Sequence, residues 1–193
     1  ISTIFVLSVA YSMSRMRFKM RKPFMNIAMI IGLFPSFMSM IAVYYILRAL
    51  NLADGAMIRV ALIIVFSAGS GAGFYVAKGF FDTISKSLDE AAIIDGATRW
   101  NVFTKITVPL SKPIIVYTIL TSFMGPWVDF IFGKVICRAD AQYYTVSIGL
   151  WKMLEKEYID SWYTCFAAGA VVVSIPIAIL FLMTQKFYVE GMT

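Results

Sequence analysis

The chain has 193 residues, of which 60% are hydrophobic, 16% aromatic and only 15% charged, and its mean hydropathy is +0.80. Soluble domains carry about 25% charged residues, so the composition excludes an ordinary soluble domain and predicts an all-α polytopic membrane protein. The chain has no histidine, and its two cysteines, Cys137 and Cys165, are not in CxxC spacing. Ser-His and Cys-His nucleophiles and thiolate-imidazole metal sites are therefore excluded, so we predict inert packing thiols and no metal site.

The first apolar segment, Ile1 to Met13, is shorter than the roughly 20 residues that a membrane span requires. It has neither an initiator methionine nor a charged leader region, so we expect it to be the remainder of a helix that begins before Ile1. Residues 14–22 then carry five cations and no acid, namely Arg15, Arg17, Lys19, Arg21 and Lys22. The positive-inside rule places this segment in the cytoplasm, and its shortness and its position between spans disfavour a nucleic-acid partner.

Four longer apolar stretches follow, so we expect about five transmembrane helices with the first one incomplete. The stretches cover approximately residues 24–47, 56–77, 113–131 and 163–183. Pro35, Gly125-Pro126 and Pro176 predict kinks within them, because proline removes a helical hydrogen bond. Gly69 and Gly73 form a GxxxG pair that favours close helix packing.

A polar, charged stretch, residues 85–109, separates two of these spans. Ser87 and Glu90 fit a capping box, which predicts a short helix that begins near Ser87 and ends at a sharp turn at Gly96. Thr98 can cap a second short helix, which we expect to end before Pro109. Two short amphipathic helices between spans are consistent with a docking element for a soluble partner, and equally with a solvated loop.

The spacing within this stretch resembles a known family. Glu90-Ala91-Ala92, three residues, Gly96, nine residues, Ile106, one residue and Val108-Pro109 follow the pattern of the EAA loop in permease subunits of ATP-binding-cassette importers, with Val108 where leucine is usual. The resemblance favours docking over a bland loop and implies a cytoplasmic coupling loop over residues 82–112. The implied ATPase-coupling residues are Glu90, Ala91, Ala92, Asp95, Gly96, Ile106 and Pro109.

The resemblance extends over residues 1–193 as a single permease domain of the type I importer core, truncated at the N-terminus and expected to be truncated at the C-terminus. Residues 78–81, 109–113 and 125–130 look like the sugar branch of these permeases, and residues 187–193 are similar to the end of MalG-like subunits of malto-oligosaccharide importers. Many sugar permeases have asparagine where this chain has Val128, so the resemblance does not fix the sugar.

The implied function is that of a transmembrane permease subunit of an ATP-driven sugar importer, for maltose or maltodextrin, in the multi-pass cell membrane of a prokaryote. The implied partners are a second permease, two cytoplasmic ATPase subunits that bind the ATP, an external sugar-binding protein and the lipid bilayer, with no cofactor in this chain. The resemblance also implies that this chain has no catalytic residue and is not an enzyme. Alternatives are an importer for another sugar or a glycerol-phosphate-like solute, and, from a different class, a channel or a gradient-driven secondary transporter. A membrane-embedded enzyme comes third, because the sequence lacks a paired acid-base cluster in mid-membrane.

Two further groups of residues are candidates for contact with substrate or partner. Asp129 is an acid near the outer end of a span, and an intramembrane acid is a functional candidate, although a hydrated interfacial carboxylate remains the alternative. With its neighbours it is expected to form the pathway or outer gate: Gly125, Pro126, Trp127, Asp129 and Phe130. The mixed outer segment, residues 133–162, is expected to contact the binding protein through Gln142, Tyr144 and Lys152.

Charge counting supports this topology. The expected cytoplasmic segments, residues 14–22, 78–112 and 184–193, hold 11 lysines and arginines against 5 acids, a net charge of +6. The remainder of the chain holds 6 of each and is neutral, so the asymmetry has the sign that the positive-inside rule requires.

Overall fold

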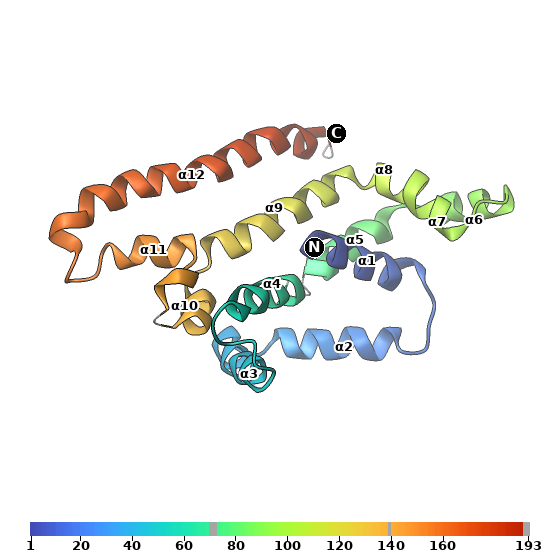
Figure 1. The fold of residues 1–193 in the computed structure, drawn as a ribbon. Helices are drawn as coiled ribbons and strands as arrows, with labels where there is room; N and C mark the ends of the chain where they lie inside the picture. Colours follow the sequence, from blue (N-terminus) through green and yellow to red (C-terminus); the bar gives the residue numbers. More distant parts are fainter. Residues whose placement is uncertain (70–72, 139, 191–193) are drawn as a thin grey trace. The chain divides into compact units, whose positions relative to one another are not determined.

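The computed structural model describes residues 1–69, 73–138 and 140–190, and in these ranges every regular element is a helix (Figure 1). The helices form two compact units, each assembled from separate parts of the chain. The first unit contains residues 1–31, 69–122 and the C-terminal residues from 184, and the second contains residues 32–68 and 123–183.

The first unit is built on the packing of α1 (Ser2–Arg15) against α5 (Gly73–Thr83). Its buried core consists of Val6, Ala10, Met13, Phe74, Ala77, Phe81 and Ile114. Ala10 and Ala77 are fully buried, and small side chains at such positions let two membrane helices approach closely. The Tyr75 hydroxyl donates a hydrogen bond to the Met25 carbonyl oxygen, which ties α5 to α2 (Arg21–Gly32).

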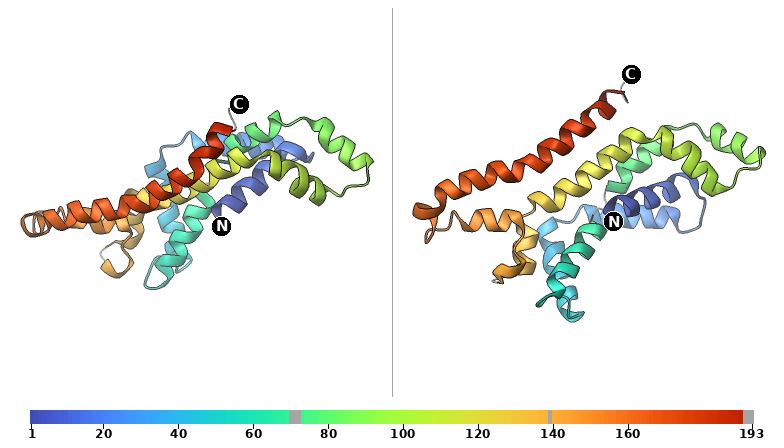
Figure 2. Two further views of the ribbon diagram at one scale, coloured as in Figure 1. Left: turned by 90° about the horizontal axis from the view of Figure 1, so that it is seen from above. Right: turned by 45° about the horizontal axis from the view of Figure 1, so that its top comes forward.

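The first unit also contains the polar stretch, residues 85–109, and the first part of the helix that follows it (Figures 1 and 2). The helices in order are α6 (Lys86–Ile94), α7 (Arg99–Val102), the π-helical turn η2 (Phe103–Thr107), α8 (Val108–Leu110) and α9 (Lys112–Val128). The second short helix, α7, ends at Val102, before Pro109 as expected, and the chain stays helical through η2 into α8, whose first turn contains Pro109. The break comes at Ser111, and the segments on either side, Arg99–Leu110 and Lys112–Val128, are bent by 82°.

The second unit contains α3 (Ser36–Ala49), α4 (Met57–Gly69), α10 (Ile131–Cys137), the 3-10 turn η3 (Ala141–Tyr143), α11 (Val146–Lys152) and most of α12 (Ile159–Glu190). Its buried core consists of Tyr44, Leu47, Ala53, Ile58, Ala61, Ile136, Cys137 and Ile148. The Cys137 thiol donates to the Tyr143 carbonyl oxygen over 3.0 Å, as expected of a packing residue. Cys165 is exposed on α12, so the prediction that both thiols pack inside is wrong for this residue.

The prolines act differently from one another. At Pro35 the prediction is confirmed, since α2 ends at Gly32 and α3 begins only after Pro35. At Pro126 the expected break is absent, because α9 continues through it and ends two residues later at Val128. α12 likewise runs through Pro176 without interruption.

Two segments are long and apolar enough to cross a membrane, Met57–Thr83 with a mean hydropathy of 1.9 and Ile159–Gln185 with 2.6. The broken pairs α2 with α3 and Arg99–Leu110 with α9 raise the number to four if each pair is one span. These findings apply to the described residues, in which α1 has 14 residues. Much of the predicted GxxxG motif lies outside the described residues, although a Cβ placed on Gly73 would lie 3.9 Å from the Val6 methyl groups.

Candidate functional site

The first short helix of the polar stretch begins two residues earlier than the capping-box pattern predicts. Ser85 is the N-cap, and its hydroxyl accepts a hydrogen bond from the Ser87 backbone N–H and bonds to the Ser87 hydroxyl. Because the helix begins at Lys86, Glu90 lies beyond the position from which a capping-box glutamate reaches back. The capping role predicted for Ser87 and Glu90 is therefore wrong, and the Glu90 carboxylate is not needed to start α6.

Gly96 ends α6 in the way the sequence predicts. Its φ is +83°, the Ala97 N–H donates to the Ala92 carbonyl oxygen over 2.9 Å, and the Gly96 N–H donates to the Ile93 carbonyl oxygen over 3.0 Å. This pair of bonds is the Schellman motif, which requires a left-handed residue at the position that Gly96 occupies. The turn at Gly96 sets the direction in which α7 leaves.

The second short helix starts at the predicted residue. The Thr98 hydroxyl accepts a hydrogen bond from the Asn101 N–H over 3.2 Å, which caps α7. Two of the implied coupling residues lie further along the helical segment Arg99–Leu110: Ile106 is half-buried in η2 and Pro109 is exposed in α8. This segment joins the turn at Gly96 directly to the bend before α9.

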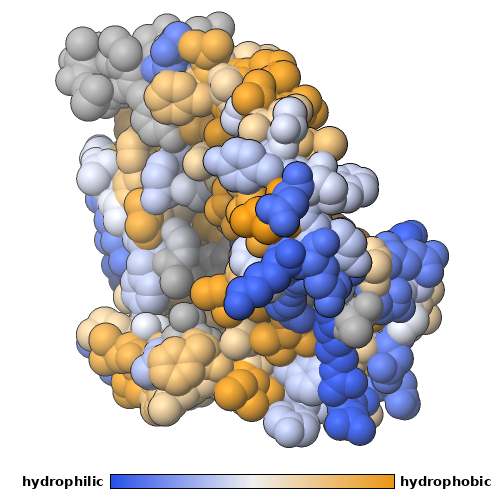
Figure 3. Space-filling model, turned by 90° about the vertical axis from the view of Figure 1, so that its left-hand side faces the viewer, coloured by the Kyte–Doolittle hydropathy of each residue, from blue (hydrophilic) through white to orange (hydrophobic). Residues whose placement is uncertain are grey.

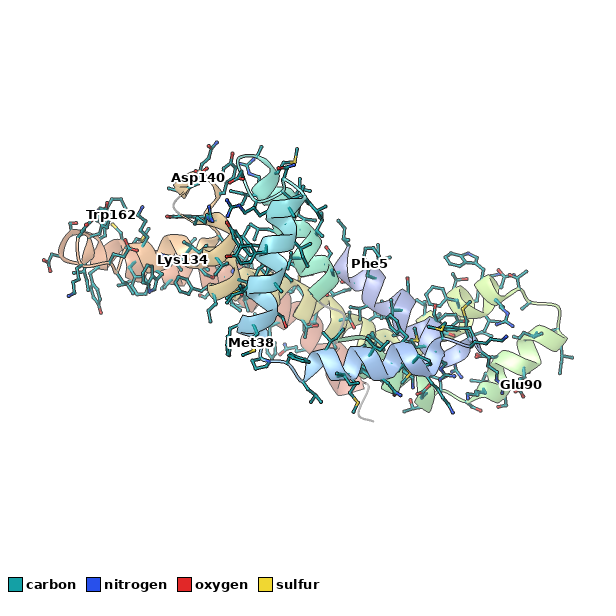
Figure 4. The ribbon with its side chains drawn as sticks, turned by 90° about the horizontal axis from the view of Figure 1, so that it is seen from below. Phe5, Met38, Glu90, Lys134, Asp140 and Trp162 are labelled. Atoms are coloured by element: carbon teal, nitrogen blue, oxygen red, sulfur yellow. The ribbon has the colours of Figure 1, made fainter. Side chains whose placement is uncertain are left out.

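The residues of α6 that are predicted to contact the ATPase are largely open to solvent. Glu90, Ala91, Asp95 and Gly96 are exposed and Ala92 is half-buried. Ile94 is 85% exposed, which is unusual for a large apolar residue on a charged helix and is typical of a contact surface. None of the ion pairs among the described residues involves Glu90, which Figure 4 shows on α6.

An interaction that the sequence did not predict holds the base of α6. The Arg15 Nε lies 3.2 Å from the Asp89 Oδ2, and the two side chains are 5% and 14% exposed. Arg15 also donates from Nη2 to the Ile84 carbonyl oxygen over 2.9 Å, and Ser14 donates to Asp82 over 2.6 Å. The end of α1 thereby fixes the first turns of α6, although Arg15 and Asp89 are 74 residues apart.

The residues predicted for the outer gate make local contacts within the second unit. The Asp129 carboxylate accepts a hydrogen bond from the Gly133 N–H over 2.8 Å, at the start of α10. Trp127 donates from Nε1 to the Val173 carbonyl oxygen of α12 over 3.2 Å, and its own carbonyl oxygen accepts from the Ser147 hydroxyl over 2.9 Å. The bonds to the Gly133 N–H and from the Ser147 hydroxyl satisfy backbone groups near the ends of α10 and α9, and the Trp127 indole N–H is bonded to α12, so both residues have a structural role.

The other gate residues surround this point. Phe130 is the N-cap residue of α10, and its ring centroid lies 5.2 Å from that of Trp151. Gly125 is exposed and Pro126 half-buried on α9. The structure therefore brings Trp127, Asp129 and Phe130 together around the start of α10.

Two of the three residues predicted to contact the binding protein come together. The Lys152 ammonium lies 5.3 Å from the centroid of the Tyr144 ring, and Lys152 also lines a small cavity of about 290 Å³ with Gly149, Met153, Tyr158 and Trp162. Gln142 is exposed in η3, where its N–H donates to Asp140 over 3.2 Å. Figure 3 is viewed from the side on which Figure 1 draws the α11–α12 connection, and it shows hydrophilic side chains among apolar ones.

Comparisons with known proteins agree in finding membrane components of transport systems. The family model for the binding-protein-dependent transport system inner membrane component matches residues 4–190. The chain is 35% identical over its whole length to the galactooligosaccharides transport system permease protein GanQ of Bacillus subtilis (strain 168), covering 66% of that protein. It is 33% identical over 95% of its length to the maltose/maltodextrin transport system permease protein MalG of Vibrio vulnificus (strain YJ016), covering 62%.

A solved structure agrees with the sequence relatives. The structure is the crystal structure of a bacterial ABC transporter involved in the import of the acidic polysaccharide alginate, which matches with a TM-score of 0.76 and 26% identity. The match covers 97% of this chain and 69% of that chain. Because the family model covers nearly the whole chain and the fold agrees, the protein belongs to the family of binding-protein-dependent transport system inner membrane components.

Proposed function

We propose that this chain is one of two permease subunits of an ATP-driven oligosaccharide importer, and that α6 and α7 are its contact with the ATPase. The observation that carries the proposal is the exposed hairpin formed by α6, Gly96 and α7, which presents Glu90, Ala91 and Ile94 to solvent. A charged helix that leaves a large apolar side chain unburied is suited to binding a groove on a soluble partner.

The partners follow from this assignment. A second permease completes the pathway, two cytoplasmic ATPase subunits bind ATP, and an external binding protein delivers the sugar. The chain itself holds no cofactor and lies in the cell membrane of a prokaryote with α6 and α7 on the cytoplasmic side. Movement of the ATPase subunits biases a two-state equilibrium between outward-open and inward-open arrangements of the spans.

For the substrate we propose a neutral oligosaccharide and place malto-oligosaccharides first. The support is the likeness to MalG and to GanQ, whose names specify maltodextrin and galactooligosaccharides. The test is uptake of labelled maltotriose and of a galactose trisaccharide into liposomes that contain both permeases and the ATPase, with the binding protein outside. ATP-dependent uptake supports the importer, and the preferred sugar decides the substrate, whereas uptake driven by an ion gradient through this chain alone would overturn the proposal.

The contact with the ATPase is tested by changing Glu90 and Ala92. Glu90→Lys should abolish ATP-driven uptake and be partly restored by a compensating acidic change on the ATPase, since ion-pair partners of opposite sign exchange in this way. Asp54→Lys, at an exposed acid outside both α6–α7 and the outer segment, is the matched control. Ala92→Trp should prevent co-purification of the ATPase by steric conflict, with Ala141→Trp as its control, and wild-type behaviour of both test variants would refute the contact.

The outer segment is tested by cross-linking. Single cysteines at Gln142, Tyr144 or Lys152 should form adducts with the binding protein, because Gln142 is exposed in η3 and Tyr144 lies beside the Lys152 ammonium within the same outer segment. Failure of all three positions in an active transporter would show that the binding protein contacts another surface.

The channel or secondary-transporter alternative relies on Asp129 as an ion site, and we favour it less. In the described residues the Asp129 carboxylate already accepts the Gly133 N–H, which leaves it less available as a mobile ion ligand.

A further inference from the structure

A cavity of about 640 Å³ lies in the first unit between the end of α1, the linker to α2, and α6 with α7, on the side that the proposed function assigns to the cytoplasm. Its charged lining comprises five cations and two acids, a net charge of +3: Arg15, Arg17, Arg21, Lys86, Arg99, Asp89 and Glu90. Tyr11, Met16, Phe18, Ile93 and Val102 give it apolar walls. Its volume is in the range of about 300–1,000 Å³ that is typical of small-molecule sites.

The buried wall of the cavity contains a donor without an acceptor. Arg15 is only 5% exposed, its Nε faces Asp89 and its Nη2 bonds to Ile84, but its Nη1 has no hydrogen-bond partner among the described residues, and neither does the Oδ1 of Asp89. Buried guanidinium donors are normally paired, because leaving one unpaired is energetically costly. An acceptor that carries negative charge would satisfy Nη1 and balance the excess of cations.

The position of the cavity indicates where such an acceptor comes from. The linker alternates strictly between basic and apolar residues from Arg15 to Arg21, and Met16, Phe18 and Met20 are 37%, 43% and 63% exposed. The linker joins two apolar helices, so it lies at the level of the lipid headgroups, where basic side chains meet phosphate and apolar ones reach the acyl chains. A soluble anion would make no use of the apolar residues.

We propose that this cavity is a binding site for the headgroup of an anionic phospholipid of the cytoplasmic leaflet. Arg17, Arg21 and Arg99 surround the phosphate, Arg15 Nη1 supplies a buried donor, and Met16 and Phe18 contact the upper acyl chain. Of the implied coupling residues, only Glu90 lines the cavity among the described residues. A lipid bound in this cavity therefore lies beside α6 and stabilises its contact with the end of α1.

The test uses the assembled importer, purified in mild detergent with phosphatidylglycerol or with phosphatidylcholine and analysed by native mass spectrometry for retained lipid. The wild type should retain phosphatidylglycerol preferentially. The double variant Arg17→Gln, Arg99→Gln should retain it about 30-fold less, since each basic residue near an anionic headgroup contributes roughly a fivefold factor. The matched control is Lys105→Gln, Lys112→Gln, which removes two exposed cations that do not line the cavity.

Several outcomes would overturn the site. Equal loss of lipid in both double variants would mean that only general surface charge attracts the lipid. Competition by millimolar inorganic phosphate against phosphatidylglycerol would assign the cavity to a soluble anion. Full retention by the permease pair alone and none in the complex with ATPase would assign it to an acidic segment of the ATPase. Lipid retention is measured without sugar, so failure here is distinguishable from failure of the proposed transport function, and thermal unfolding of each variant checks that it is folded.

Discussion

A substitution at Gly96 perturbs the hairpin formed by α6, Gly96 and α7 without any change in packing. Gly96 has a φ of +83°, and no atom lies within 4 Å of a Cβ built on it. A side chain at this position therefore meets no neighbour, and its cost is backbone strain alone, about 1–2 kcal/mol for Ala and more for the β-branched Val. Asn should be tolerated better than either, because it adopts the left-handed conformation more readily.

This strain should loosen the end of α6 by a measurable amount. A cost of about 1–2 kcal/mol corresponds to roughly 5- to 30-fold more frequent opening of the turn. Hydrogen exchange of the Ala97 amide, which is bonded to the Ala92 carbonyl oxygen over 2.9 Å, should accelerate by that factor in Gly96→Ala. ATP-driven uptake should fall in the order wild type, Asn, Ala and Val, because the direction of α7 becomes less well defined.

Gly79 provides the control for this experiment. It lies inside α5 with open space around its Cβ position and no positive φ, so Gly79→Ala should leave both readouts unchanged or improve helix stability slightly. If Gly96→Ala leaves the exchange of Ala97 and the uptake unchanged, or if both variants lose uptake equally, the reasoning from the turn is refuted.

Two further predictions follow from the contacts of acidic residues. Asp89→Ala should destabilise the first unit by about 3 kcal/mol in thermal unfolding, because it leaves the buried Arg15 without its ion-pair partner. Asp95 is exposed, so Asp95→Ala should cost far less. Equal effects of the two variants would contradict the pairing of Arg15 with Asp89. Asp129→Asn keeps an oxygen that can accept from the Gly133 N–H, so assembly should be normal while sugar uptake is impaired; normal uptake would mean that Asp129 acts only as a cap for α10.

The coupling hairpin could be predicted in large part from the sequence, because its signals are local. The turn at Gly96 and the cap at Thr98 each depend on residues within a few positions, and both are found where the pattern puts them. The start of α6 was misplaced because Ser85 and Ser87 both fit an N-cap and the sequence does not rank them. The family also followed from local spacing, since Glu90-Ala91-Ala92, Gly96, Ile106 and Pro109 lie on one continuous stretch.

The ion pair between Arg15 and Asp89, which holds α6 to the end of α1, could be found only from the tertiary structure. Arg15 was recognised only as one of several cytoplasmic cations, because no local pattern distinguishes the arginine that pairs with Asp89 from those that remain exposed. The roles of Asp129 and Trp127 likewise depend on which backbone groups of α10, α11 and α12 reach them. Periodicity, capping and charge asymmetry act over one or two turns of helix, whereas pairing across 74 residues depends on how α1 packs against α5, which sequence spacing does not specify.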